Sequence, residues 1–130
     1  MSMQDYFEST RGTGVLATAN AEGKVDVAIY ARPHFIDADT IAFIMRDRLT
    51  HANLQSNPHA AYLFHQAEGG YKGKRLYLTK VGEETDPEKI AGIRRREKQM
   101  TGETSEAEAQ FLVTFRIDKV RPLVGDDEAT

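Results

Sequence analysis

The stretch DADTIAFIMRDRLTHANLQSNPHAAYLF, residues 37–64, decides the fold. It holds the short apolar run TIAFIM at Thr40–Met45 and all but the last residue of the run HAAYLFH at His59–His65, and both runs predict strands. Between them, residues 48–56 carry apolar and small side chains at helical spacing. Asn57-Pro58 ends this helix, because proline disfavours helical geometry in the residue before it. The stretch therefore predicts a strand, a short helix and a second strand.

The residues before this stretch predict an antiparallel meander. The apolar run Gly14–Ala19 is followed by the turn-forming residues 20–23, and Val25–Tyr30 returns as a strand with alternating apolar side chains. Arg32-Pro33-His34 interrupts the pattern, and a proline at this place indicates a bulge or an edge position. Phe35-Ile36 then leads through a turn into the next strand.

The rest of the chain predicts two further strands and two helices. Residues 75–82 and 109–120 alternate apolar and polar side chains, as strands with one buried face do. Asp86-Pro87 predicts a helix start, because aspartate is a good N-cap and proline is favoured at the first helical position. A short helix is also predicted over residues 2–10, with Ser2 as one candidate cap.

These elements add up to about six strands and three short helices, which is a mainly β (α+β) fold. Hairpins dominate the first half of the chain, so parallel βαβ folds are disfavoured. A small barrel removes the free edges of six antiparallel strands. We expect a single domain over residues 1–130, with a helix in residues 1–10 and a flexible tail at 125–130.

The composition is that of an ordinary globular protein and excludes several classes of function. The formal net charge is −3, so a nucleic-acid partner is disfavoured, because non-specific nucleic-acid binding needs a basic excess. The chain has no cysteine, which excludes disulfides, thiolate nucleophiles and cysteine-ligated metals. Residues 1–11 do not resemble a signal peptide and no stretch approaches the length of a membrane span, so we expect a cytoplasmic protein.

The densest polar cluster is Arg46-Asp47-Arg48-Leu49-Thr50-His51-Ala52-Asn53, where a predicted strand ends and a helix begins. A helix N-terminus exposes unpaired backbone N–H groups at the positive end of its dipole. Two arginines and a threonine hydroxyl beside such an end suit a phosphate group. In the alternative interpretation the arginines are solvated surface charges and Thr50 is only a helix cap.

Two other segments are weaker candidates. Arg32 could turn toward the same place, or it could simply pair with a nearby carboxylate. The basic segment 70–75 could cover an anionic substrate, although a solvated hairpin loop is the more common role of such a sequence. The four histidines show no metal-ligand spacing, so we expect no metal site.

The order of these segments resembles the pyridoxamine-phosphate-oxidase-like family of FMN-binding split barrels over residues 5–124. The similarity lies in the opening hairpin GVLATANAEGKVDVAIY, the stretch at 37–64, the strand GKRLYLTKVGEE and the closing strand FLVTFRIDKVRPL. The resemblance implies a six-stranded antiparallel Greek-key split barrel. It also implies a homodimer with flavin mononucleotide (FMN) bound between the subunits.

The same resemblance assigns cofactor-binding roles to ten residues. Carried over by position, they are Ala28, Ile29 and Tyr30 along the flavin ring, Ile44, Met45, Arg46 and Asp47 at the isoalloxazine and ribityl region, and Arg48, Thr50 and Asn53 at the phosphate. Family members often carry a lysine just before or at the threonine position, where this chain has Leu49 and Thr50. Arg46 or Arg48 would then supply the positive charge, and a guanidinium can do so with two hydrogen bonds.

The implied function is an FMN-dependent reductase or oxidase of a small molecule, with the chemistry carried by the flavin. The chain is shorter than true pyridoxamine phosphate oxidases, so we do not transfer their vitamin B6 activity. Other interpretations remain open: a non-catalytic flavin-binding or electron-transfer protein, a split barrel that uses haem, a deazaflavin or no ligand, and a dimeric interaction module. No side chain is a convincing acid or base; Tyr30, His34 and His51 are only candidate neighbours of the flavin.

Overall fold

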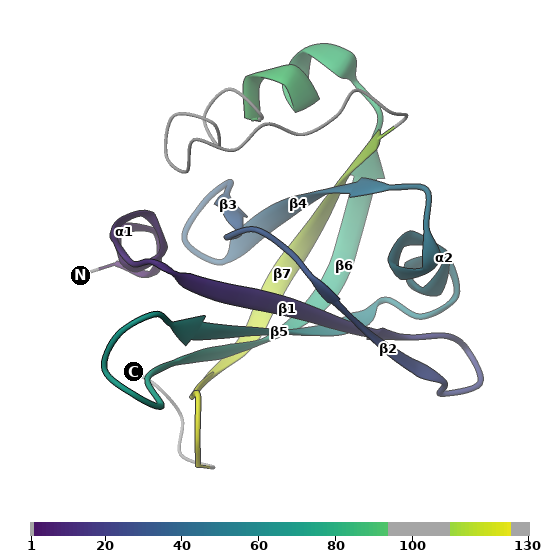
Figure 1. The fold of residues 1–130 in the computed structure, drawn as a ribbon. Coiled ribbons are helices and arrows are strands. Elements are labelled where there is room, and N and C mark those ends of the chain that lie inside the picture. Colours follow the sequence, from purple (N-terminus) through teal and green to yellow (C-terminus); the bar gives the residue numbers. More distant parts are fainter. Residues whose placement is uncertain (1, 94–109, 126–130) are drawn as a thin grey trace.

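The computed structural model describes residues 2–93 and 110–125 (Figure 1). Its labelled elements are α1 (Met3–Ser9), β1 (Gly12–Ala19), β2 (Val25–Ile29), β3 (His34–Phe35), β4 (Thr40–Arg46), α2 (Leu49–Ser56), β5 (His59–Gln66), β6 (Gly73–Glu84) and β7 (Gln110–Pro122). A further helix begins at 87 and is described as far as 93. Of the predicted tail, residues 126–130 lie outside the described part of the chain.

The described strands form one antiparallel sheet with the order β2-β1-β5-β6-β7-β4-β3. Its two edge strands, β2 and β3, are not paired with each other, so the sheet curls into a split barrel rather than a closed one (Figure 1). This confirms the predicted mainly β fold with three helices. The described residues contain seven strands instead of about six, because the break at Arg32-Pro33 separates β3 from β2.

The local signals for helix starts are confirmed. The Ser2 side chain caps α1 by accepting a hydrogen bond from the Asp5 backbone N–H at 3.1 Å. Asp86 accepts one from the Glu88 backbone N–H at 3.0 Å, and the helix follows directly at 87. Ile90 of that helix is buried in a small apolar cluster on β4 and β7.

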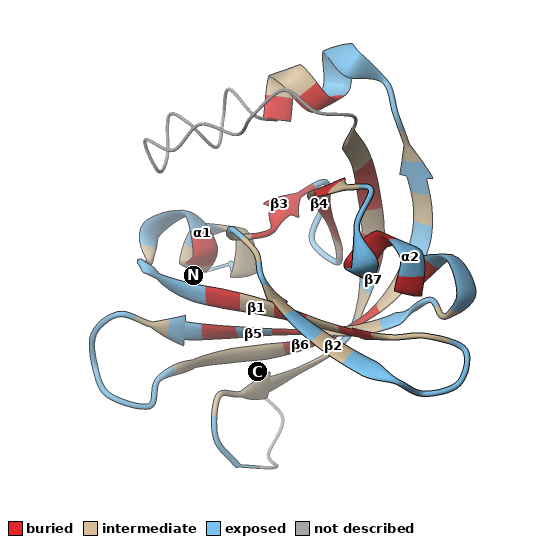
Figure 2. Cartoon of the chain, turned by 45° about the vertical axis from the view of Figure 1, so that its right-hand side comes forward, coloured by how far each residue is buried: buried red, intermediate tan, exposed pale blue. Residues whose placement is uncertain are grey.

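The main core fills the barrel and is rich in aromatic side chains. Tyr62 and Phe64 of β5 lie at its centre with 0% exposure, and Phe7 of α1 closes one end of it. The Tyr62 phenol donates to the backbone oxygens of Tyr30 at 3.4 Å and Ala31 at 3.0 Å, so burial of this ring also fixes the end of β2. Helices α1 and α2 lie at opposite ends of β1 (Figures 1 and 2).

Strand β2 turns its apolar side chains outward. Val25, Val27 and Ile29 are 82%, 66% and 78% exposed, while Asp26 and Ala28 between them are half-buried. Figure 2 shows β2 as a largely exposed strand at the front of the barrel. The register continues this outward face across β1 and β5, where it includes the apolar residues Val15, Ala17, Ala61 and Leu63. We call these seven residues the β2 face.

No helix in the described ranges is long and apolar enough to cross a membrane.

Candidate functional site

The predicted phosphate turn lies at the junction of β4 and α2. Arg48 is the N-cap of α2 and has an extended backbone, but no side chain caps the first N–H groups of this helix. The Arg48 N–H instead bonds to the Arg46 oxygen at 2.9 Å, which closes a tight turn between the two arginines. Thr50 is therefore not the cap; it is buried inside the first turn of the helix.

A pocket of about 380 Å³ opens in front of this turn. Its described lining contains Arg32, Arg46 and Arg48 and no carboxylate, so its electrostatic potential favours an anion. Apolar and aromatic side chains form the remaining wall, namely those of Ile29, Tyr30, Phe43 and Ile44. The pocket thus combines a cationic end with an apolar wall, as a flat ring system bearing a phosphate requires.

Seven of the ten predicted cofactor residues line this pocket: Ala28, Ile29, Tyr30, Ile44, Arg46, Arg48 and Thr50. Met45, Asp47 and Asn53 do not. Met45 is 1% exposed and lies in the core, because side chains alternate along β4 and Ile44 takes the pocket side. The Asn53 amide donates to the Thr18 hydroxyl at 3.1 Å, both buried, and so ties α2 to β1.

The pocket also contains residues that the sequence did not assign to the cofactor. Gln110 lies opposite Arg46 across the β4–β7 pairing. The two residues are far apart along the chain, so no local sequence pattern indicated that they meet at this pocket. Arg32 was a weaker candidate, and the structure brings it into the lining. It pairs with no carboxylate of the described residues; its Nη1 donates to backbone oxygens at the end of α1.

Tyr30 connects the apolar wall to the phosphate turn. Burial raises the pKa of its phenol, and the nearby Asp26 carboxylate acts in the same direction. A side-chain hydrogen bond with Thr50 acts against them and tends to lower that pKa. The phenol is thus a neutral group beside the turn.

A polar network behind the turn holds α2 on the sheet. His51 Nε2 lies 3.0 Å from Glu83 Oε2, and the His51 ring stacks on Phe111 with 3.8 Å between ring centroids. Asp47, which is 75% exposed, lies 3.4 Å from the other ring nitrogen, Nδ1. The charged groups of this network stay outside the pocket lining. Within the described residues, no group of three or more histidine, aspartate or glutamate side chains is arranged to hold a metal ion.

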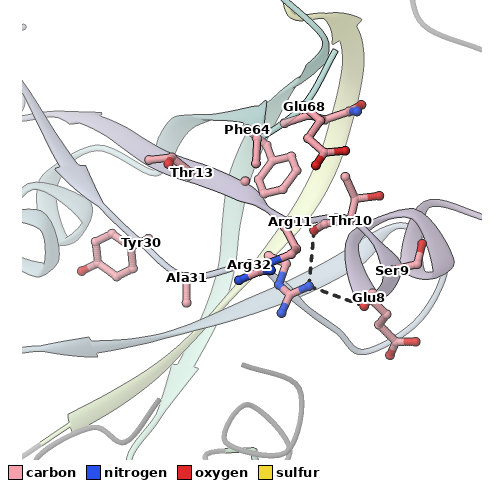
Figure 3. A pocket seen from close by; sticks show the side chains of 14 residues that line it. Glu8, Ser9, Thr10, Arg11, Thr13, Tyr30, Ala31, Arg32, Phe64 and Glu68 are labelled. Atoms are coloured by element: carbon pink, nitrogen blue, oxygen red, sulfur yellow. Dashed lines mark hydrogen bonds between the residues drawn. The ribbon is translucent and has the colours of Figure 1, made fainter. Parts of the chain in front are cut away.

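A second, larger pocket of about 890 Å³ lies between the end of α1, the start of β1 and the end of β5 (Figure 3). It shares Tyr30, Ala31 and Arg32 with the first pocket, so the two are neighbours along the end of β2. Its described lining is mixed in charge, with Arg11 and Arg32 facing two glutamates, Glu8 and Glu68.

Comparisons with known proteins agree with this architecture. The family model described as pyridoxamine 5'-phosphate oxidase matches residues 3–123. A search of curated proteins found no match.

Among solved structures, an FMN-binding protein from Syntrophomonas wolfei has a TM-score of 0.77 at 18% identity, covering 95% of this chain and 84% of its own. HupZ of Group A Streptococcus has 0.74 at 17% identity, with 98% and 96% covered. An F420 reductase has 0.72 at 14% identity, with 89% and 94% covered. At such identities these likenesses show a shared fold. The family model, which spans nearly the whole chain, shows that this protein belongs to the pyridoxamine 5'-phosphate oxidase family.

Proposed function

We propose that the chain is a cytoplasmic flavoprotein that binds FMN in the pocket in front of the β4–α2 turn. The observation that carries this proposal is the charge of the pocket. Three guanidinium groups and the uncapped start of α2 meet there, and the described lining holds no carboxylate. A phosphate dianion would be stabilised by all of these groups.

The residues present fit FMN as a whole. Arg46 and Arg48 would hold the phosphate, and Ile29, Tyr30 and Ile44 would lie along the apolar ring system. FMN would supply hydride and electron transfer, while this chain binds the cofactor, orients it and limits its contact with water. Family membership and the FMN-binding protein among the structural neighbours support this choice.

We further propose that the protein is a homodimer. The β2 face exposes three large aliphatic side chains on an edge strand, and exposed apolar edges of this kind mark sites of association. Ile29 belongs both to this face and to the pocket lining, so a second copy that covers the face also borders the pocket. Because Ile29 connects the β2 face with the pocket, the proposed FMN site lies at the boundary between the two subunits.

The proposed activity is an oxidoreductase reaction on a small molecule. No described side chain is assigned as a catalytic acid or base. A flavoprotein that only binds flavin or transfers electrons has the same pocket, and reduction of the loaded protein by NADH or NADPH separates the two.

The test begins with the absorbance spectrum and the mass of whatever small molecule co-purifies with the protein. FMN is then titrated into the ligand-free protein and into the variant Arg48→Ala. Losing a charged hydrogen bond costs about 1.5–3 kcal/mol, so the variant should bind FMN roughly ten- to a hundredfold more weakly. Riboflavin, which has no phosphate, should bind both proteins equally.

The matched control is Lys24→Ala, which removes an exposed cation in the β1–β2 turn, away from the pocket lining. It should leave FMN affinity unchanged. Equal FMN affinity in wild type and Arg48→Ala would contradict the phosphate site. A co-purified haem or deazaflavin, with no binding of added FMN, would contradict the cofactor.

A further inference from the structure

The guanidinium of Arg32 is held rigidly where the two pockets meet. Its Nη1 donates to the backbone oxygens of Phe7 at 3.0 Å, Thr10 at 3.3 Å and Glu8 at 3.4 Å. Figure 3 draws the bonds to Thr10 and Glu8. These carbonyls belong to the end of α1, where the helix leaves its last oxygens without intrahelical partners. Because one nitrogen makes all three bonds, the Nε–Nη2 edge of the group has no partner within the described residues.

Such an edge is suited to a carboxylate. A guanidinium presents two parallel N–H groups that match the two oxygens of a carboxylate, and fixing the guanidinium in advance lowers the entropy cost of binding. Arg32 lines both pockets, so an anion bound at its open edge would lie beside the Tyr30 wall of the proposed flavin site.

Arg11 adds a second cation to the larger pocket. Its side chain is exposed and makes no hydrogen bond or ion pair within residues 2–93 and 110–125. Figure 3 shows Arg11 and Arg32 at the same pocket, Arg11 from the connection between α1 and β1 and Arg32 from the segment that follows β2. Arg11, which has no side-chain partner in the described ranges, and the anchored Arg32 are therefore two cationic donors available to a ligand.

The pocket is also shaped for a small organic molecule. Its volume of about 890 Å³ lies in the range of small-molecule sites. Gly12, Thr13 and Gly14 of β1 line one side of it, and the ring of the buried Phe64 lies directly behind Gly12. Gln66 accepts a hydrogen bond from the Tyr6 phenol at 2.5 Å, so its amide oxygen is engaged and its N–H groups are left as donors.

The charge balance indicates which anion fits. In the described lining, Arg11 and Arg32 are offset by Glu8 and Glu68, so the pocket is neutral overall. The neighbouring pocket carries three arginines and no acid. A phosphate dianion therefore prefers the neighbouring pocket, while a singly charged carboxylate can bind near the arginines without strong repulsion from the glutamates.

We propose that the pocket at the end of α1 binds a small organic monocarboxylate, whose carboxylate is received by Arg32 and Arg11. The role of this molecule as the substrate that meets the flavin rests on the proposed function. The binding itself depends only on the geometry of this pocket.

The test uses benzoate, its neutral analogue benzamide and phenyl phosphate, each titrated by calorimetry into the protein with and without added FMN. Benzoate should bind about tenfold more tightly than benzamide in both states, and about tenfold more tightly than phenyl phosphate once FMN fills the neighbouring pocket, as the loss of one charged hydrogen bond implies. Arg11→Ala should weaken benzoate binding by about the same factor and leave benzamide unchanged. Lys24→Ala is again the matched control and should bind benzoate like the wild type.

Arg32 is tested with a conservative substitution, because its removal would leave the carbonyls at the end of α1 without their donor. Arg32→Lys keeps a charge for the helix carbonyls but removes the two-pronged edge, so it should weaken benzoate binding while its thermal midpoint stays close to that of the wild type. Benzamide binding as tightly as benzoate would overturn the proposal, as would phenyl phosphate doing so in the FMN-loaded protein or unchanged benzoate affinity in Arg11→Ala. FMN affinity, followed separately by absorbance, shows whether a failure belongs to this pocket or to the flavin site.

Discussion

Glu83 shows how one side chain can hold a functional turn without lining its pocket. Burial alone would raise the pKa of this carboxyl, but hydrogen bonds from Lys80, Gln55 and His51 outweigh that effect and lower the pKa to about 2. Lys80 Nζ donates at 2.6 Å and Gln55 Nε2 at 2.9 Å. Through His51 and Gln55 the carboxylate fastens α2 to β6, and α2 begins at the arginines of the pocket.

This network predicts a specific dependence of stability on pH. Because the pKa of Glu83 is depressed from 4.5 to about 2 in the folded state, its contribution is present above 4.5 and is lost as the pH falls toward 2. Glu83→Gln should therefore be less stable than the wild type near neutral pH. In urea unfolding, that difference should shrink as the pH falls through this window.

The matched control is Glu22→Gln, because Glu22 lies exposed in the β1–β2 turn and its side chain has no bonded partner in the described ranges. Its stability should follow the wild type at every pH. A difference between wild type and Glu83→Gln that stays constant across the window would show that the carboxylate charge is not what the network stabilises.

The orientation of the side chains of strand β2 can be assigned only once its neighbouring strands are known. Its valines and isoleucine alternate as they would in any half-buried strand, yet in the fold they point away from the core. The inward positions are Asp26 and Ala28, next to a β1 strand that buries Leu16 and Thr18 on that side. An outward apolar set on an edge strand is unfavourable for an isolated chain, and a second copy relieves it.

The dimer prediction is tested by placing a charge in the middle of that strand. Val27→Asp should convert the protein from dimer to monomer in size-exclusion chromatography with light scattering, because a carboxylate buried in an apolar interface is costly. Val27 is already 66% exposed in one chain, so the fold of the subunit should persist, with an unchanged circular dichroism spectrum.

The control is Ile36→Asp, which places the same charge on another exposed apolar residue, 53% exposed, beside the opposite edge strand β3. It should leave the dimer intact. A wild-type protein that is monomeric at all concentrations, or a dimeric Val27→Asp, would rule out the β2 face as the interface.

The barrel as a whole is a scaffold that brings distant segments to one place. The proposed flavin pocket draws its lining from β2, β4, the start of α2 and the first residue of β7. The lining comes from residues 28–32, 43–50 and 110, three segments that lie apart along the chain, so the pocket exists only in the folded state. A ligand of this pocket must therefore stabilise the native protein and not the unfolded chain.

That linkage predicts the effect of FMN on thermal unfolding. At a hundred times its dissociation constant, FMN should stabilise the fold by about 2.7 kcal/mol and raise the thermal midpoint by on the order of 10 °C. Arg48→Ala at the same FMN concentration should show a much smaller rise. A wild-type midpoint that does not move at any FMN concentration would contradict binding to the native state.

Much of the fold could be read from local patterns. The alternation of strands, the caps at Ser2 and Asp86, the helix stop at Pro58 and the helix start at Pro87 all act within a few residues, so the sequence determined them by itself. The basic turn at 46–50 was predicted in the same way, because an uncapped helix start next to arginines is a local feature.

Tertiary structure decided which face each strand buries and which distant groups meet. Alternation divides a strand into two sets of side chains but does not say which set is inside, and so Met45 went to the core and the β2 valines to the surface. Gln110 reached the pocket through strand pairing, and Arg32 was fixed by carbonyls more than twenty residues earlier in the chain. These contacts depend on how the sheet curls, and no local pattern encodes that.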